Sequence, residues 1–158
     1  TRCREVSWAR RCVIRDSVQR VKSGSVKLSK HKEKIESGLV IFVCLEDSDT
    51  ESTFLKFGQK MEKYCFFNDE QGRFSKCIND ISGEDLLISQ FSLLASTNKG
   101  LKPSFHKAAN YQDAKKLFKS LKEILCSRYN FYKFGEFGAN MTVEIINDGP
   151  LTLTFKFK

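Results

Sequence analysis

The chain has 158 residues, which is enough for one domain that buries about two thirds of the surface of its unfolded form. Its 41% apolar and 29% charged residues argue against a disordered chain, and no apolar run approaches the ~20 residues that span a bilayer, so we expect no membrane association. The net charge of +8 favours a polyanionic partner such as RNA, but a basic surface can also serve solubility alone.

The basic residues concentrate at the two ends of the chain. Lys and Arg outnumber Asp and Glu by seven in residues 1–37 and by six in residues 99–158, whereas the acids lead by five in residues 38–98. Residues 1–14, which are rich in arginine, are expected to form an N-terminal extension: a targeting segment, a loosely attached tail or a cloning remnant. One folded domain should then occupy residues 15–158.

The first part of this domain is predicted to contain three strands. Residues 15–21 form the first strand, and Gly24 would turn the chain into a second strand within residues 22–28. The polar, lysine-rich residues 29–37 would form an exposed hairpin tip or loop. The continuous apolar run over residues 38–45 predicts a central strand that is buried on both faces.

Two amphipathic helices and several strands are predicted to follow. Residues 46–50 supply acids and an N-cap to the first helix. Its apolar stripe recurs at i, i+3, i+7 and i+10 and would belong to the core: Phe54, Phe57, Met61 and Tyr64. The remaining elements are a short strand (65–67), a turn (68–72), a strand (85–94), a loop (96–105), a helix (112–129) and two strands (141–146 and 151–157) joined by a protruding loop. The expected fold class is a single α/β domain, in which mixed or antiparallel sheets form a partial barrel or sandwich with two main helices packed on it.

The cysteines and histidines give no sign of a metal site. The six cysteines form no C-x-x-C pair, and the two histidines, His31 and His106, would need cysteines from remote positions to complete a zinc site. Cys44 lies within an apolar run, where a free thiol behaves as a small core residue. Because no secretory signal is evident, we expect reduced cysteines, a cytoplasmic location and neither metal nor cofactor.

Two short segments carry the candidate chemistry. In the first, an apolar strand breaks into polar residues at Ser89, Gln90, Phe91 and Ser92, a place where a scaffold holds working groups. Alternation would put Ser89 and Phe91 on one face of the strand, and the hydroxyls could also simply satisfy neighbouring backbone groups. A serine hydrolase is the weaker interpretation, because no G-x-S-x-G elbow is present and His106 has no evident acid partner.

The second segment is Asn147-Asp148-Gly149-Pro150, which by itself could be an ordinary turn between strands. Together the two segments resemble the signature motifs of the D-aminoacyl-tRNA deacylases, Ser-Gln-Phe-Thr and Gly-Pro-Val-Thr. The resemblance runs over residues 15–155 and includes further matches in the same order at residues 19–21, 67–72, 99–105 and 134–141. The one departure in the first motif is Ser92 in place of Thr, which keeps the hydroxyl and loses a methyl group.

The resemblance implies a fold, a partner and a role for each matched residue. It implies a homodimer that hydrolyses D-aminoacyl-tRNA, in which Gly149 and Pro150, joined by a cis bond, reach into the pocket of the partner subunit and exclude L-amino acids. Residues 89–92 would hold the ester carbonyl and the terminal adenosine, while backbone N–H groups near Phe91 and Ser92 stabilise the oxyanion and the ribose 2′-hydroxyl assists. Supporting roles fall to Arg20, which would prop the Gly-Pro loop, and to Met141, Lys99 and Phe105.

Glycine has no chirality, so glycyl-tRNA is an expected side substrate. Two alternatives from other classes stay open: a non-catalytic RNA-binding module of the same fold, and a serine esterase for small substrates that uses Ser92 or His106.

Overall fold

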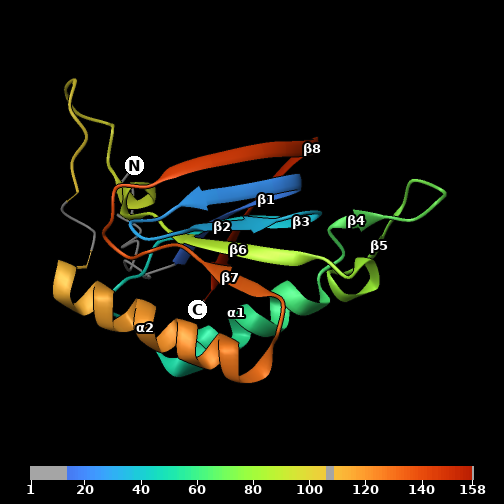
Figure 1. Ribbon diagram of the computed structural model, residues 1–158. Helices are drawn as coiled ribbons and strands as arrows, with labels where there is room; N and C mark the ends of the chain where they lie inside the picture. Colours follow the sequence, from blue (N-terminus) through green and yellow to red (C-terminus); the bar gives the residue numbers. More distant parts are fainter. Residues whose placement is uncertain (1–13, 106–108, 158) are drawn as a thin grey trace, which may run out of the picture.

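The structure is a computed structural model that describes residues 14–105 and 109–157 (Figure 1). The expected extension at residues 1–14 therefore lies outside the described residues, except that Ile14 is the first residue of a strand. Of the helices in these ranges, none is long and apolar enough to cross a membrane. The elements in chain order are β1 (Ile14–Lys27), β2 (Lys32–Ile35), β3 (Gly38–Val43), α1 (Glu51–Lys63), β4 (Phe67–Asn68), β5 (Phe74–Lys76), the 3₁₀ turn η1 (Asn79–Ile81), β6 (Glu84–Ser89), the 3₁₀ turn η2 (Phe91–Leu94), α2 (Tyr111–Arg128), β7 (Tyr132–Phe134) and β8 (Thr142–Phe157).

A mixed sheet forms the centre of the domain, and two helices cover one of its faces (Figure 1). The strand order is β2-β1-β3-β6-β7, with β8 paired along β1, and β4 and β5 form a separate hairpin. Strands β3, β6 and β7 are parallel to one another, whereas β1 is antiparallel to each of its partners. The predicted α/β class, with a mixed sheet and two main helices, is confirmed.

The predicted central strand and both predicted helices are present. β3 lies between β1 and β6, and all its residues are buried except Phe42, which is partly exposed. Thr50 caps α1, and its hydroxyl accepts the N–H of Thr53, one half of a capping box. The predicted stripe of α1 packs into the core through Phe54, Phe57 and Met61, while Phe118, Leu121 and Leu125 of α2 pack into the same cluster.

The prediction of a turn at Gly24 was wrong, because β1 continues through it to Lys27. Gly24 is buried, and a Cβ atom there would lie 2.6 Å from Cγ2 of Val40, so this glycine allows close packing within the sheet. The predicted loop over residues 29–37 contains β2, an edge strand with exposed lysines and a buried Ile35. Lysine on an edge strand discourages pairing with other chains, which explains the loop-like composition.

The C-terminal prediction of two strands and a loop was also wrong, because β8 is one strand that pairs with β1 along its whole length. The segment that looked like a loop is a bulge in this strand: Thr152 pairs with Gln19 and Asn147 pairs with Val21, so residues 148–151 stand opposite Arg20 alone. Strand β7 was not predicted, since three residues carry too little periodicity to reveal a strand.

Candidate active site

The first motif lies where β6 ends. The strand stops at Ser89 rather than at residue 94, because its partner β3 ends at Val43: the N–H of Gln90 makes the last ladder bond, to the carbonyl of Val43, and the chain then winds into η2. The predicted alternation of side chains therefore holds only as far as Ser89. In parallel sheets the carboxyl ends of neighbouring strands meet at one edge, which is the usual position of a ligand site.

A cavity of about 470 Å³ opens at this edge, within the range of small-molecule sites. Four segments contribute to it: the turn after β6, the loop before α2, the first turn of α2, and the connection between β7 and β8. Its described lining residues are Ser89, Gln90, Phe91, Ser92, Phe105, Ala109, Tyr111, Ala114, Phe137, Gly138, Ala139 and Met141.

Aromatic rings form two of the cavity walls. The ring centroids of Phe91 and Phe105 lie 4.9 Å apart, and those of Tyr111 and Phe137 lie 5.5 Å apart. Gly138 has a φ of +73°, and a Cβ atom there would lie 2.6 Å from the hydroxyl oxygen of Tyr111, so only glycine permits this approach. Phe91 is 63% exposed, which leaves its ring free for a flat ligand to stack on.

The polar groups of the cavity are mostly backbone groups. In the described part of the chain, the N–H groups of Phe91 and Ser92 have no hydrogen-bond acceptor, because they open the 3₁₀ turn η2 and no side chain caps it. The side-chain amide of Gln90 donates to Oγ of Ser92 over 3.1 Å. On the buried side of the turn, Sγ of Cys44 donates to the carbonyl of Phe91 over 3.6 Å.

The titratable groups near this turn do not form a nucleophilic centre. Burial, with Glu46 and Asp16 adding to it, raises the pKa of the Cys44 thiol to about 12, so this sulfur stays protonated and acts as a donor. The described lining residues include no imidazole, carboxylate or amine. His106, the candidate base of a serine esterase, lies outside the described residues. The residues that line the cavity thus include two, Phe91 and Ser92, whose N–H groups are free to donate.

The second motif is an exposed bulge held by one arginine. The Gly149–Pro150 peptide bond is cis, and both residues are exposed. Nε of Arg20 donates to the carbonyl of Asp148 over 3.2 Å and lies 3.3 Å from its carboxylate. Nη1 of Arg20 donates to the carbonyl of Phe66 and to the side chain of Asn68, over 3.0 and 2.7 Å, and so ties the bulge to β4.

A family model matches almost all of the residues that form this fold and this site. The model of the family described as D-Tyr-tRNA(Tyr) deacylase matches residues 17–156. The chain belongs to the D-Tyr-tRNA(Tyr) deacylase family. Among its relatives, a D-aminoacyl-tRNA deacylase of Francisella tularensis subsp. novicida (strain U112) is 39% identical over 140 residues, which are 88% of this chain and 97% of the relative. Another, from Dichelobacter nodosus (strain VCS1703A), is 40% identical over 136 residues, 85% of this chain and 94% of the relative.

Solved structures share the fold. One described as "c-Myc DNA Unwinding Element Binding Protein" is 34% identical, has a TM-score of 0.80 and is matched over 89% of this chain and 97% of its own. A second, described as a probable eukaryotic D-amino acid tRNA deacylase, has a TM-score of 0.78 at 14% identity, with 92% and 100% covered. The second likeness supports the fold alone.

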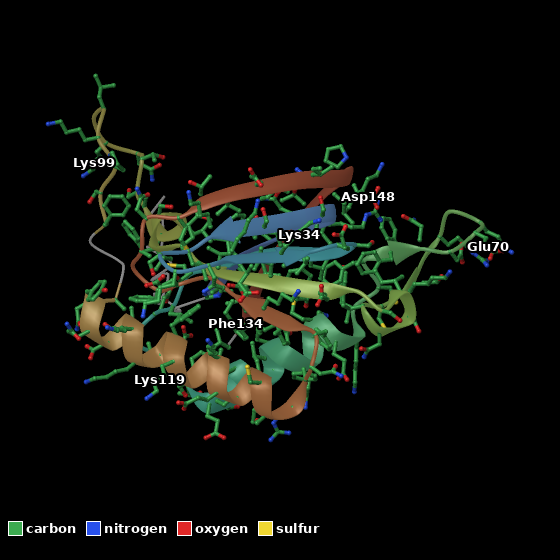
Figure 2. The ribbon with its side chains drawn as sticks, viewed as in Figure 1. Lys34, Glu70, Lys99, Lys119, Phe134 and Asp148 are labelled. Carbon is green, nitrogen blue, oxygen red and sulfur yellow. The ribbon has the colours of Figure 1, made fainter. Side chains whose placement is uncertain are left out.

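The structure brings only some of the predicted site residues together. Residues 89–92, Phe105 and Met141 line one cavity, and Met141 accepts the N–H of Glu136 through its sulfur over 3.3 Å. Lys99 lies in the exposed loop that follows η2, at the left of Figure 2, and does not line the cavity. Asp148, next to Gly149 and Pro150, lies at the opposite end of the sheet (Figure 2).

Six of the described cavity residues were missed from the sequence: Ala109, Tyr111, Ala114, Phe137, Gly138 and Ala139. Phe137 lies inside a stretch that matched the deacylase family, so the resemblance pointed to its segment but not to its role. Tyr111 precedes the helix predicted over residues 112–129, and nothing in its local pattern shows that the start of this helix faces the end of β6.

Proposed function

We propose that this chain hydrolyses the ester bond between a D-amino acid and the 3′ end of tRNA, and releases the free amino acid and the tRNA. Family membership supports this proposal, as does the name D-aminoacyl-tRNA deacylase of its curated relatives. The observation that carries it is the cavity at the end of β6, which is lined by Phe91 and Ser92, two residues whose N–H groups have no acceptor within the described residues. Such a site stabilises charge on oxygen without a titrating side chain.

The cavity suits the terminal adenosine and its ester. An adenine ring would stack on the aromatic walls, a contact worth about 1–3 kcal/mol per base. The ester carbonyl would then point at the two N–H groups of η2. Water attacks the carbonyl carbon with assistance from the ribose 2′-hydroxyl, and the tetrahedral oxyanion is held by the N–H groups. The bond to the ribose oxygen breaks, and that oxygen takes a proton.

The selection of D-amino acids would come from a second copy of the chain. Gly149 and Pro150 are exposed, and the neighbouring Asp148 lies at the end of the sheet opposite the cavity (Figure 2), which supports a role for the bulge in the cavity of a partner subunit. In a homodimer the carbonyl groups of this bulge would accept hydrogen bonds from the α-ammonium and leave no room for an L side chain. Glycyl-tRNA would pass this filter, because glycine has no side chain to exclude.

The decisive test is hydrolysis of D-Tyr-tRNA and L-Tyr-tRNA by the purified chain, with a chelator present. Rapid loss of the D-ester alone supports the activity, the chirality filter and metal independence together. Equal loss of both esters would indicate a general esterase. A third reaction uses Gly-tRNA at enzyme levels that clear D-Tyr-tRNA and tests the side activity. If Gly-tRNA is not hydrolysed, a filter that excludes only L side chains is contradicted.

A non-catalytic nucleic-acid-binding protein is the second candidate. The net charge of +8 favours it, and so does the 34% identical solved structure, because the name of that protein states that it binds a DNA element. This candidate predicts tRNA binding with hydrolysis of neither ester. A serine esterase is less well supported, because Oγ of Ser92 faces the amide of Gln90 and not a base, and it predicts labelling by serine-reactive phosphonates.

The four cysteines in the described residues are free, which agrees with action in the cytoplasm.

A further inference from the structure

A second and larger cavity runs beside the candidate active site. Its volume is about 760 Å³, and it lies between α2, β7 and the turn that joins β1 to β2. The two cavities share Phe137, so they form a continuous surface along α2. Lysines line it from all three elements: Lys30, Lys115, Lys116, Lys119, Lys122 and Lys133.

The acids of this groove leave the lysines largely uncompensated. The lining contains six lysines and only two acids, Glu33 and Glu136, and within the described residues neither acid forms an ion pair with a lysine. Within the described ranges, Lys30, Lys115 and Lys116 make no ion pair, and Lys119 makes only an exposed one with Glu123 at 3.8 Å. An exposed pair of this kind contributes little, so four amines remain available to an anion.

Two further lysines of the groove contact neighbouring groups. Nζ of Lys133 lies 3.1 Å from the carboxylate of Glu84, and Nζ of Lys122 lies 5.3 Å from the ring centroid of Phe134. Figure 2 shows Phe134 between β7 and α2, with Lys119 on the helix beyond it. The groove thus has an apolar base and a basic rim.

The order of residues along α2 gives the groove a direction. Tyr111 and Ala114 in the first turn line the active-site cavity, and Lys115 to Lys122 in the next turns line the groove. From Tyr111 to Lys122 the helix rises about 16 Å, which is long enough for roughly three to five phosphates of one strand. An RNA strand whose last nucleotide lies in the cavity would therefore place its preceding phosphates beside these lysines.

We propose that this groove binds the phosphodiester backbone of the tRNA acceptor end and guides the 3′ nucleotide into the cavity; this inference rests on the proposed function. The basic residues of the groove are lysines and none is arginine. A lysine ammonium contacts phosphate as a point charge, without the planar fork of donors that arginine presents. Because contacts to phosphate carry no sequence information directly, the groove would position tRNA without selecting its sequence.

The test compares two substrates and two double variants of the full chain. The groove variant is Lys115→Gln/Lys119→Gln, and the control is Lys60→Gln/Lys63→Gln on α1, which removes the same charge outside the groove. For D-Tyr-tRNA at physiological salt, we expect the groove variant to raise KM about 10-fold and to lower the slope of log KM against log salt by about 1–2, with kcat unchanged. For 3′-O-D-tyrosyl-adenosine, which has no phosphate, both parameters should stay unchanged. An unchanged KM for D-Tyr-tRNA, or a rise equal to that of the control, would overturn the proposal.

A binding measurement separates this inference from the proposed function. Fluorescence anisotropy with uncharged tRNA needs no hydrolysis, and the groove variant should show a Kd about 10-fold higher than the control variant. If the wild-type chain cleaves no ester yet the groove variant loses tRNA affinity, the proposed function fails and the groove stands. If duplex DNA of similar length binds as tightly and with the same lysine dependence, the groove is a general polyanion surface and its assignment to the acceptor end is wrong.

Discussion

The two motifs of this chain differ in how they are built. The first forms a cavity from four separate segments, in which each wall is supported by its neighbours. The second is a bulge in a single strand, exposed to solvent and held chiefly by the side chain of Arg20. They lie at opposite ends of one sheet, and the proposed function therefore requires a second copy of the chain to bring them together (Figures 1 and 2).

This difference indicates where each motif is vulnerable. The cavity depends on packing, so a change in one wall leaves the other walls in place. The bulge depends on charge-assisted hydrogen bonds, each worth about 1.5–3 kcal/mol, which all converge on one guanidinium. Small changes at the bulge should therefore alter activity more than small changes in the cavity.

The largest effect is expected for Gly149→Ala. The φ of Gly149 is +119°, and a Cβ atom there would lie 3.2 Å from Nη2 of Arg20, so alanine displaces the bulge from its anchor. We expect kcat/KM for D-Tyr-tRNA to fall about 100-fold, because a displacement of this kind misplaces the groups that hold the substrate. Affinity for uncharged tRNA, measured by fluorescence anisotropy, should stay within twofold of the wild type.

A matched control for this change is Gly72→Ala. Gly72 also has a positive φ, +77°, but nothing lies within 4 Å of its added Cβ atom, so it bears backbone strain without touching the bulge. Its activity should equal that of the wild type. If both alanine variants lose activity equally, the loss reflects general destabilisation and the special role of the bulge is disproved.

Arg20→Lys should have a smaller effect of about 10-fold on kcat/KM. Lysine keeps the charge but cannot donate to Asp148, Phe66 and Asn68 at once, and the carbonyl of Phe66 loses its donor. The free energy of unfolding, measured in urea, should fall by about 1–3 kcal/mol. The exposed Arg73, whose Nε lies 3.3 Å from the carboxylate of Asp69, provides the control: Arg73→Lys should change neither quantity.

Local patterns predicted the elements that depend on local chemistry. The stripe of Phe54, Phe57 and Met61, the N-cap at Thr50 and the apolar run of β3 each contain their own signal, and each was found. The bulge was misread because Asp-Gly-Pro is also the composition of a turn. Pairing along the full length of β1, which is a long-range effect, decided between the two structures.

In the candidate site, too, residues with a local sequence signal were found and residues placed by long-range packing were not. Residues 89–92 could be found because they are consecutive and together resemble one motif of the deacylase family, although the end of the strand at Ser89 was not predicted. Tyr111 and Phe137 could not, because their place in the cavity depends on how α2 and the β7–β8 connection lie against β6. The basic groove was likewise visible only as a surplus of charge, since its lysines come from three separate elements.

Ser92→Ala tests whether the cavity works through backbone groups. Oγ of Ser92 accepts a hydrogen bond from Gln90, while its N–H, which alanine retains, is the proposed oxyanion donor. We expect kcat to fall no more than about 5-fold, and Ser92→Thr, which adds a methyl group, to change it less than about 3-fold. A loss beyond about 1,000-fold in single-turnover hydrolysis would identify Ser92 as a nucleophile. The proposal that the cavity works through backbone N–H groups would then be wrong.

The smallest effect on activity is expected for Asp85→Asn. Asp85 begins the buried part of β6 and lines neither cavity, and within the described residues its carboxylate has no hydrogen-bond partner. Burial raises the pKa of Asp85 well above its usual range, so the folded chain keeps a proton that the unfolded chain releases. Below the usual pKa of about 3.9 both states are protonated, and as the pH rises above it the folded state is progressively disfavoured.

The Asp85→Asn variant should therefore gain stability over the wild type as the pH rises above about 4, with kcat/KM unchanged. Urea unfolding at several pH values measures this difference. Asp80 provides a control of opposite sign, because the N–H of Cys77 donates to its carboxylate and lowers its pKa, so Asp80→Asn should lose stability at neutral pH and recover it in acid. A pH-independent difference for Asp85→Asn would mean that its carboxylate is already ionised in the fold and has a partner. Even in that case the variant should keep its deacylase activity, because Asp85 belongs neither to the cavity nor to the bulge.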